Sequence, residues 1–181
     1  DLKLVLQTRK VSFFQLRLKN YSLKQKILIG KKIKNICKNN KVKFLINDDP
    51  ILALKLNADG CHLGQKDMNI KEAKKIIGNK IIGITCHNSI NLAKKAIKAK
   101  ANYLAFGAFY SSKTKKTKYK SSTKILSKIK KITEIPIVAI GGINSDNYKN
   151  LLLNNANFLA ISSYIWKNKK YKPLQAIKKL K

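Results

Sequence analysis

The chain has 181 residues, enough for one domain with a substantial core, and its hydrophobic fraction of 44% is ordinary for a globular protein. No apolar run approaches the roughly 18 residues that a membrane-spanning helix needs, which argues against a membrane protein. The charge is extreme, with 40 Lys and Arg against 8 Asp and Glu and a net charge of +32, so nucleic-acid binding has to be weighed.

Short apolar runs alternate with amphipathic, helix-like stretches, and this alternation predicts an α/β fold. Runs that are apolar throughout are typical of strands buried on both faces of a parallel sheet. The predicted strands are 12–16, 42–46, 60–63, 81–84, 103–106, 137–140 and 158–161. The predicted helices are 23–39, 71–77, 88–100, 122–132, 145–153 and 173–180.

The predicted strands are one fewer than the eight of a (β/α)₈ TIM barrel. Leu2, Leu4, Val5 and Leu6 resemble the end of a helix, so the first strand is expected to precede Asp1. We therefore predict a single TIM-barrel domain over residues 1–181, N-terminally truncated so that it lacks its first strand. An open doubly wound sheet is the alternative, but the GxGxxG fingerprint that often follows its first strand is absent.

The distribution of the positive charge favours drift in base composition over a nucleic-acid site. The lysines are spread along the whole chain, and only Arg9 and Arg17 are arginines, although arginine reads bases better than lysine does. Ile and Asn are abundant together with Lys, as AT-rich codons would produce. A basic nucleic-acid-binding protein is kept only as an alternative.

The acidic residues point to a metal. The active site of a parallel barrel lies at the C-terminal ends of its strands, and three of the eight acids, Asp48, Asp49 and Asp67, fall just past neighbouring predicted strands. Adjacent carboxylates repel each other unless a cation lies between them. Nearby lysines could supply that charge, but Mg²⁺ is favoured because it binds one or two carboxylates together with phosphate oxygens.

Two further segments suggest phosphate binding. Gly141 and Gly142 are expected to open a helix after a strand, where backbone N–H groups can approach an anion, although a tight turn would look the same. Ser163, near the next strand end, strengthens the phosphate prediction. The long loop 107–120 carries Ser112, Thr114 and Lys115, which would suit a cover over phosphates, but a solvated lysine-rich loop fits equally well.

The cysteines and histidines carry little functional signal. Cys37, Cys61 and Cys86 are odd in number and lack metal-site spacing, which predicts free thiols in a reducing cytoplasm. His62 is interpreted as structural. His87 lies near the predicted site and is compatible with either a structural or a functional role.

Six short motifs occur in order along the chain. They are 15–19 (QLRLK), 45–48 (LIND), 62–67 (HLGQKD), 83–88 (GITCHN), 106–107 with 112–115 (FG and SKTK) and 139–143 (AIGGI). In this order and spacing they resemble the motifs of the thiamine phosphate synthase family, and the resemblance extends from about Leu2 to Ile165.

The resemblance implies a transferase of thiamine biosynthesis that joins hydroxymethylpyrimidine diphosphate to a thiazole phosphate, releasing thiamine phosphate and pyrophosphate. It also implies that the diphosphate departs first, with Mg²⁺ as cofactor, and that the thiazole nitrogen captures a pyrimidine methyl cation. By the same resemblance, Asp48 and Asp67 bind Mg²⁺, and Gln15 contacts the pyrimidine. The residues implied to act on the diphosphate in catalysis are Arg17, Lys19, Thr85 and Lys115, with Asn47 as a further contact. The residues implied to bind the thiazole phosphate are Ser112, Thr114, Gly142 and Ser163.

The chain departs from the family pattern at Asp49, at Thr85 and in the loop after Phe106, where Ala108 and Ser111 stand in place of prolines. Asp49 stands where Arg is usual and removes a positive charge, whereas Thr85 stands where Ser is usual and keeps the hydroxyl. A thiazole tautomerase on the same barrel is the alternative enzyme, but Asp48 and Asp67 suit a diphosphate better. A homo-oligomer is a further expectation, because either a partner chain or the missing N-terminal residues would have to cover the strand edges of an open barrel.

Overall fold

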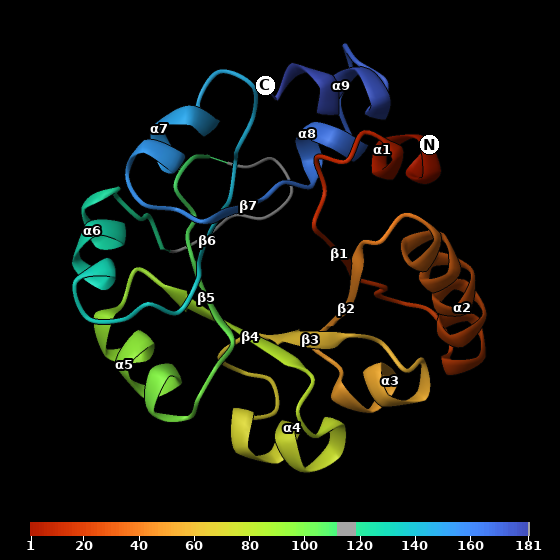
Figure 1. Cartoon of the computed structure of the whole chain (residues 1–181), viewed down its shortest axis with the longest axis horizontal. Coiled ribbons are helices and arrows are strands. Elements are labelled where there is room, and N and C mark those ends of the chain that lie inside the picture. Colours follow the sequence, from red (N-terminus) through yellow and green to blue (C-terminus); the bar gives the residue numbers. More distant parts are fainter. Residues whose placement is uncertain (112–118, 181) are drawn as a thin grey trace. The chain divides into compact units, whose positions relative to one another are not determined.

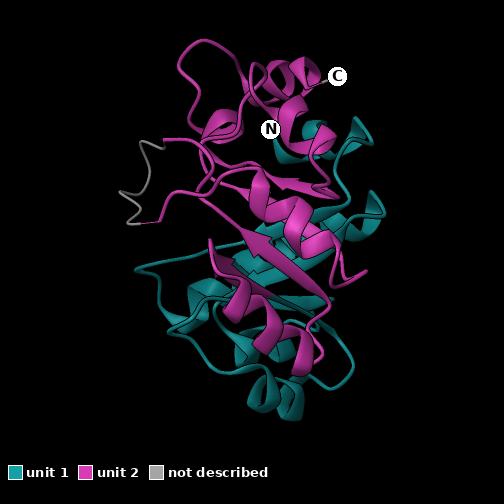
Figure 2. Ribbon diagram, turned by 90° about the vertical axis from the view of Figure 1, so that its left-hand side faces the viewer, with its two compact units in different colours: residues 1–83 teal, residues 84–181 magenta. Residues whose placement is uncertain are grey.

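The computed structural model describes residues 1–111 and 119–180, and these form two compact units. Unit 1 comprises Asp1–Gly83 and unit 2 comprises Ile84–Lys181 (Figure 2). Both units repeat the predicted alternation of strand and helix (Figure 1). In the described residues of each unit the strands pair in parallel and in chain order, as expected of βα repeats.

Unit 1 pairs β1 with β2 and β2 with β3. Helix α2 packs against β2, and α3 packs against β2, β3 and α4. The elements of unit 1 are α1 (Leu2–Gln7), β1 (Phe13–Leu16), α2 (Leu23–Asn39), β2 (Lys43–Asn47), α3 (Pro50–Lys55), β3 (Gly60–Leu63) and α4 (Ile70–Ile77). Strand β4 (Ile81–His87) crosses the boundary between the units.

Unit 2 pairs β5 with β6 and β6 with β7. Helix α5 contacts α6, and α8 contacts α9. The elements of unit 2 are α5 (Ile90–Lys98), β5 (Tyr103–Phe106), α6 (Lys124–Lys130), β6 (Ile137–Ile140), α7 (Tyr148–Leu153), β7 (Phe158–Ala160), α8 (Ser163–Trp166) and α9 (Pro173–Lys179).

Local side-chain chemistry fixes where the helices of unit 1 begin. Ser22 and Gln25 form a reciprocal capping box at the start of α2, which satisfies two backbone N–H groups. Asn69 accepts a hydrogen bond from the Glu72 N–H and so caps α4. These caps set the points at which the chain leaves each strand end and enters the next helix.

The buried core follows from the apolar runs. All of β3 is buried, and Phe44 and Ile46 of β2 are each 1% exposed. Each such side chain contributes about 1.5–3 kcal/mol by leaving water. The polar residues of the strand ends are held on this rigid base.

Asp59 of unit 1 has a structural role at the N-terminal ends of strands β2 and β3. Asp59 accepts a hydrogen bond from the Phe44 N–H at 2.8 Å and pairs with Lys43 at 3.2 Å, so it joins the starts of β2 and β3. Asn157 of unit 2 does the same for β6, accepting from the Ile137 N–H at 2.8 Å. Sequence reasoning missed both residues because it examined only the strand ends.

Replacing Asp59 with Ala is expected to lower the free energy of unfolding by about 1–3 kcal/mol, since the Phe44 N–H would lose its acceptor. Urea denaturation measures this. The control is Glu134→Ala, which breaks the exposed Lys130–Glu134 ion pair but no backbone hydrogen bond and should cost about 0.5 kcal/mol or less. Equal losses in the two variants would contradict the bracing role of Asp59.

Candidate functional site at the strand ends of unit 1

Unit 1 brings together the predicted site residues that follow β1, β2 and β3. Gln15 lies in β1, and its side-chain amide donates a hydrogen bond to the Oδ1 of Asn47, the last residue of β2. Arg17 and Lys19 follow β1 in the exposed loop before α2. Asn47 was expected to follow its strand and is instead its final residue, because the pairing with His62 of β3 extends β2 by one position.

Two backbone arrangements hold Asp48 and Asp67. Asp48 has a φ of +65°, in the left-handed region that Asp tolerates better than most residues, and its N–H donates to the His62 carbonyl at 2.7 Å. The Oδ2 of Asp67 accepts from the Gly64 N–H at 2.6 Å. The Asp67 carboxylate and the Asp48 backbone are therefore each held by a backbone contact at or just after β3.

The two carboxylates are close enough to affect each other. Partial loss of water around Asp48 raises the pKa of its carboxyl, and Asp67 raises this pKa further through a shared hydrogen bond and charge repulsion. Arg17 and Lys19 lower the same pKa by attraction. A cation bound between Asp48 and Asp67 would reduce the charge repulsion between their carboxylates.

The donor set fits Mg²⁺. In the described part of the chain, no group of three or more His, Cys, Asp and Glu side chains could enclose a metal ion, so a structural zinc cage is not formed there. Mg²⁺ needs only one or two carboxylates when substrate phosphates and water supply the remaining oxygens. Asp48 and Asp67 provide such a pair.

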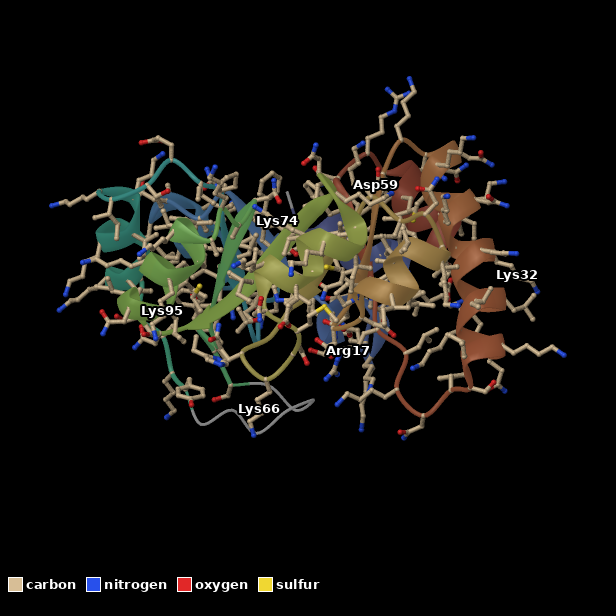
Figure 3. The ribbon with its side chains drawn as sticks, turned by 90° about the horizontal axis from the view of Figure 1, so that it is seen from below. Arg17, Lys32, Asp59, Lys66, Lys74 and Lys95 are labelled. Atoms are coloured by element: carbon tan, nitrogen blue, oxygen red, sulfur yellow. The ribbon has the colours of Figure 1, made fainter. Side chains whose placement is uncertain are left out.

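A cavity of about 500 Å³ lies beside these residues. It is within the size range of small-molecule sites. Figure 3 shows Arg17 on the same side of unit 1 as Lys66, whereas Asp59 lies on the opposite side. The lining residues are Arg17, Leu18, Lys19, Asn20, Lys26, Asn47, Asp48, Asp49, Pro50, Ile51 and Met68.

The structure accounts for the unusual Asp49. Its Oδ1 accepts a hydrogen bond from the Leu52 N–H at 2.8 Å, and Pro50 occupies the first position of α3. Asp as N-cap followed by Pro is a standard start for a helix, because it satisfies one free N–H and suits the helix dipole. Asp49 therefore starts α3, a short helix that the sequence analysis did not predict.

His62 adds no positive charge to the site near neutral pH. Its side chain is 8% exposed, and burial lowers its pKa to about 4, against a smaller opposite effect of Asp67. The structural interpretation of this residue therefore agrees with its burial. His87, at the end of β4, stacks on Tyr119 with 4.3 Å between ring centroids.

The other predicted site residues belong to unit 2. Thr85 lies within β4 rather than after it, because this strand extends to His87. Ser163 is the first residue of α8 rather than the end of a strand. Ser112, Thr114 and Lys115 lie outside the described residues.

The glycine turn after β6 is braced by its neighbours. Gly142 has a φ of +66°, and a Cβ atom there would lie 2.6 Å from the Tyr110 carbonyl oxygen and 2.5 Å from that of Ser111. The Asn147 amide donates to the Gly142 carbonyl at 3.1 Å, and the Tyr110 hydroxyl donates to the Asn147 carbonyl at 3.1 Å. The turn and residues 110–111 thus form one packed substructure.

The helix after this turn begins later than predicted. It was expected at Ser145 but starts at Tyr148. The Asn144 side chain accepts from the N–H groups of Asp146 and Asn147, and such local bonds favour a turn over a helix. The glycines therefore do not open a helix directly, and any anion there would contact the turn rather than the first turn of α7.

The cysteines are buried and chemically quiet. Cys37, Cys61 and Cys86 are free and each 0% exposed. Burial is the main cause that raises the pKa of Cys37 to about 11 and the pKa values of Cys61 and Cys86 to about 12. The thiolate, which is the reactive form, is thus scarce at neutral pH.

A thiol reagent such as Ellman's reagent is therefore expected to label none of the three cysteines in the folded protein at pH 8 and all of them in urea. The measurement is the absorbance released per chain. Rapid labelling of Cys86 in the folded state, identified by mass spectrometry, would contradict its burial.

Comparison with known proteins gives the family. The model of the family described as thiamine monophosphate synthase matches residues 2–165. The chain belongs to the thiamine monophosphate synthase family. It is 71% identical over 181 residues to the thiamine-phosphate synthase of Pelagibacter ubique (strain HTCC1062), covering all of this chain and 87% of that protein. It is 39% identical to that of Nitrosomonas eutropha (strain DSM 101675 / C91 / Nm57), covering 86% of this chain and 74% of that protein.

The solved structure of thiamine phosphate pyrophosphorylase from Pyrococcus furiosus matches with a TM-score of 0.89 at 30% identity, covering 99% of this chain and 85% of that one. The predicted α/β fold of the TIM-barrel class is thereby confirmed, as is the assignment as a thiamine-phosphate synthase, a transferase that acts on small molecules. Among the described helices, none has the length and hydropathy to cross a bilayer.

Proposed function

We propose that the strand ends of unit 1 bind the diphosphate of hydroxymethylpyrimidine diphosphate together with Mg²⁺, and that this site drives departure of pyrophosphate. The observation that carries the proposal is the acid pair of Asp48 and Asp67 beside Arg17 and Lys19. Two acids and two cations in one place suit a metal-bound diphosphate better than a neutral substrate.

Asp48 and Asp67 would hold Mg²⁺, which when bound neutralises negative charge on diphosphate oxygens. Backbone contacts from Gly64 and His62 orient the two acids before substrate arrives. Arg17 and Lys19 contact the diphosphate oxygens and stabilise the charge that grows on the leaving group. Because both side chains are exposed, they also attract the substrate from solution.

Gln15 and Asn47 form a hydrogen-bonded pair that places polar groups between the diphosphate and the pyrimidine. Asn47 contacts the diphosphate, and Gln15 contacts the pyrimidine ring. The link between them fixes both amides, so each presents a defined donor or acceptor to the substrate.

In unit 2, the turn at Gly142 and the Ser163 hydroxyl bind the thiazole phosphate. The positive φ of Gly142 lets backbone N–H groups of the turn point toward an anion, and the packing of Gly142 against the carbonyls of Tyr110 and Ser111 fixes the turn. Thr85, half-buried in β4, offers its hydroxyl as a further diphosphate contact.

The chemistry needs little from acid–base groups. The bond between the pyrimidine methylene carbon and the diphosphate oxygen breaks, and its electron pair leaves with pyrophosphate. The lone pair of the thiazole nitrogen then forms the new carbon–nitrogen bond. Neutralisation of the leaving group is the main demand, and it is met by cations rather than by a general base. The buried thiols support a reducing cytoplasm as the compartment.

The test is to incubate the protein with both substrates and Mg²⁺ and to measure pyrophosphate release. We expect release only when the pyrimidine diphosphate, the thiazole phosphate and Mg²⁺ are all present. A parallel incubation of the thiazole phosphate alone in D₂O follows deuterium exchange. Exchange without any pyrophosphate release in the complete mixture would support a tautomerase and refute the proposal.

A further inference from the structure

We propose that Lys26, on helix α2, is an additional diphosphate-binding residue of this chain. The proposal rests on the proposed function of unit 1 and extends it to a residue outside the six sequence motifs. Those motifs point to the ends of strands, whereas Lys26 comes from the first turns of a helix.

The start of α2 directs Lys26 to the cavity. The capping box of Ser22 and Gln25 fixes the first turn of α2, and the Lys26 N–H donates to the Ser22 carbonyl at 2.9 Å. Lys26 is half-buried and lines the same cavity as Arg17 and Asp48. The capped first turn fixes the backbone from which Lys26 extends, and the partial burial of its side chain places it against the cavity rather than in bulk solvent.

Charge balance shows why a third cation matters. The cavity is lined by the three cations Arg17, Lys19 and Lys26 and by the two carboxylates Asp48 and Asp49, a formal charge of +1. Without Lys26 the formal charge of the lining would be zero. A lining with excess positive charge favours a diphosphate, and the preference grows as the leaving group takes up the bonding electrons.

Lys26 is also available to a ligand. Lys26 takes part in neither the Lys43–Asp59 nor the Lys130–Glu134 ion pair of the described residues. Its neighbour Lys24 lies on the same helix, but it is exposed and does not line the cavity. Comparing substitutions at Lys26 and Lys24 therefore distinguishes a direct contact of Lys26 with the diphosphate from the general effect of losing one positive charge on α2.

The experiment compares Lys26→Gln, Lys26→Arg and Lys24→Gln with the wild type. Calorimetry measures pyrophosphate binding in EDTA, which reports on the cations without a metal, and steady-state assays give KM for each substrate. We expect Lys26→Gln to weaken pyrophosphate binding and raise KM for the pyrimidine diphosphate, each about 10-fold, with KM for the thiazole phosphate changed less than about 2-fold. Lys26→Arg should restore most of the binding, and Lys24→Gln should behave like the wild type.

The outcomes separate the inference from the function it rests on. If the wild type releases pyrophosphate from its substrates but Lys26→Gln binds pyrophosphate as well as Lys24→Gln does, Lys26 is not a ligand and only the inference fails. If Lys26→Gln raises both KM values equally, the residue acts through the fold, and the inference also fails. If the wild type neither binds pyrophosphate nor releases it, the proposed function fails too.

Discussion

Replacing Asp48 or Asp67 with Asn is expected to lower kcat/KM for the pyrimidine diphosphate by about 10²–10³-fold, and the two changes together should do little more harm than either alone. Each substitution removes one charged ligand from a two-carboxylate site, and half of such a pair holds Mg²⁺ poorly. Residues that act as one unit have non-additive effects. Pyrophosphate release at saturating thiazole phosphate measures the change.

Asn is chosen because it keeps an oxygen acceptor for the Gly64 N–H that Asp67 now binds, so the β3–α4 loop should remain folded. The matched control is Glu72→Gln, which removes an exposed carboxylate from α4 of the same unit and should leave the rate within about 2-fold. Thermal unfolding confirms that the variants are folded. A folded Asp67→Asn variant with wild-type kcat/KM would remove Asp67 from the metal site.

Gly142→Ala is expected to raise KM for the thiazole phosphate by about 10-fold or more and to lower the free energy of unfolding by about 2–4 kcal/mol. The new Cβ would lie 2.6 Å from the Tyr110 carbonyl oxygen and 2.5 Å from that of Ser111, at a φ of +66°. The turn has to shift, and the phosphate contacts shift with it. Steady-state kinetics and urea denaturation measure the two effects.

Gly78→Ala separates the two causes of this loss. Gly78 has nearly the same φ, +62°, but no atom lies within 4 Å of its Cβ position. At a ψ of −132° its backbone lies in a region that is nearly restricted to glycine, so Gly78→Ala should lose only the backbone strain of Ala there, about 1–3 kcal/mol, and keep both KM values. If both variants lose equal stability and neither changes KM, the packing of Gly142 against residues 110–111 has no bearing on phosphate binding.

Most strands could be predicted because their apolar runs are continuous and the structure buries them. The strands at 60–63, 103–106 and 137–140 agree with the prediction to the residue. Strand β4 was predicted too short, at 81–84, because Thr85 and His87 interrupt the apolar run that was taken to define the strand. Polar site residues occupy the C-terminal ends of parallel strands, so an apolar run underestimates the length of a strand at that end.

Other features depend on contacts that the sequence pattern does not contain. Helix α3 has six residues, too few for a clear periodicity, although Asp49 followed by Pro50 is a recognisable helix start. The later start of α7 depends on the side-chain bonds of Asn144, which compete with helix formation. Lys26 reaches the cavity only because of where α2 lies, and no strand-end motif includes it.

For the site as well, some features could be predicted from the sequence and others required the structure. The acid pair was found from composition, because Asp48 and Asp67 are rare acids that both follow strands. Their mutual influence and the backbone contacts that hold them required the structure. The functions of all the predicted site residues, including the acid pair, stay predictions.

The most direct test is calorimetric titration of pyrophosphate into the wild type and into the Asp48→Asn/Asp67→Asn double variant, each with Mg²⁺ and with EDTA. We expect Mg²⁺ to tighten binding to the wild type by about 10-fold or more and to give no such gain in the folded double variant. An equal gain from Mg²⁺ in both proteins would contradict the assignment of Asp48 and Asp67 as the pair that holds the metal-bound diphosphate.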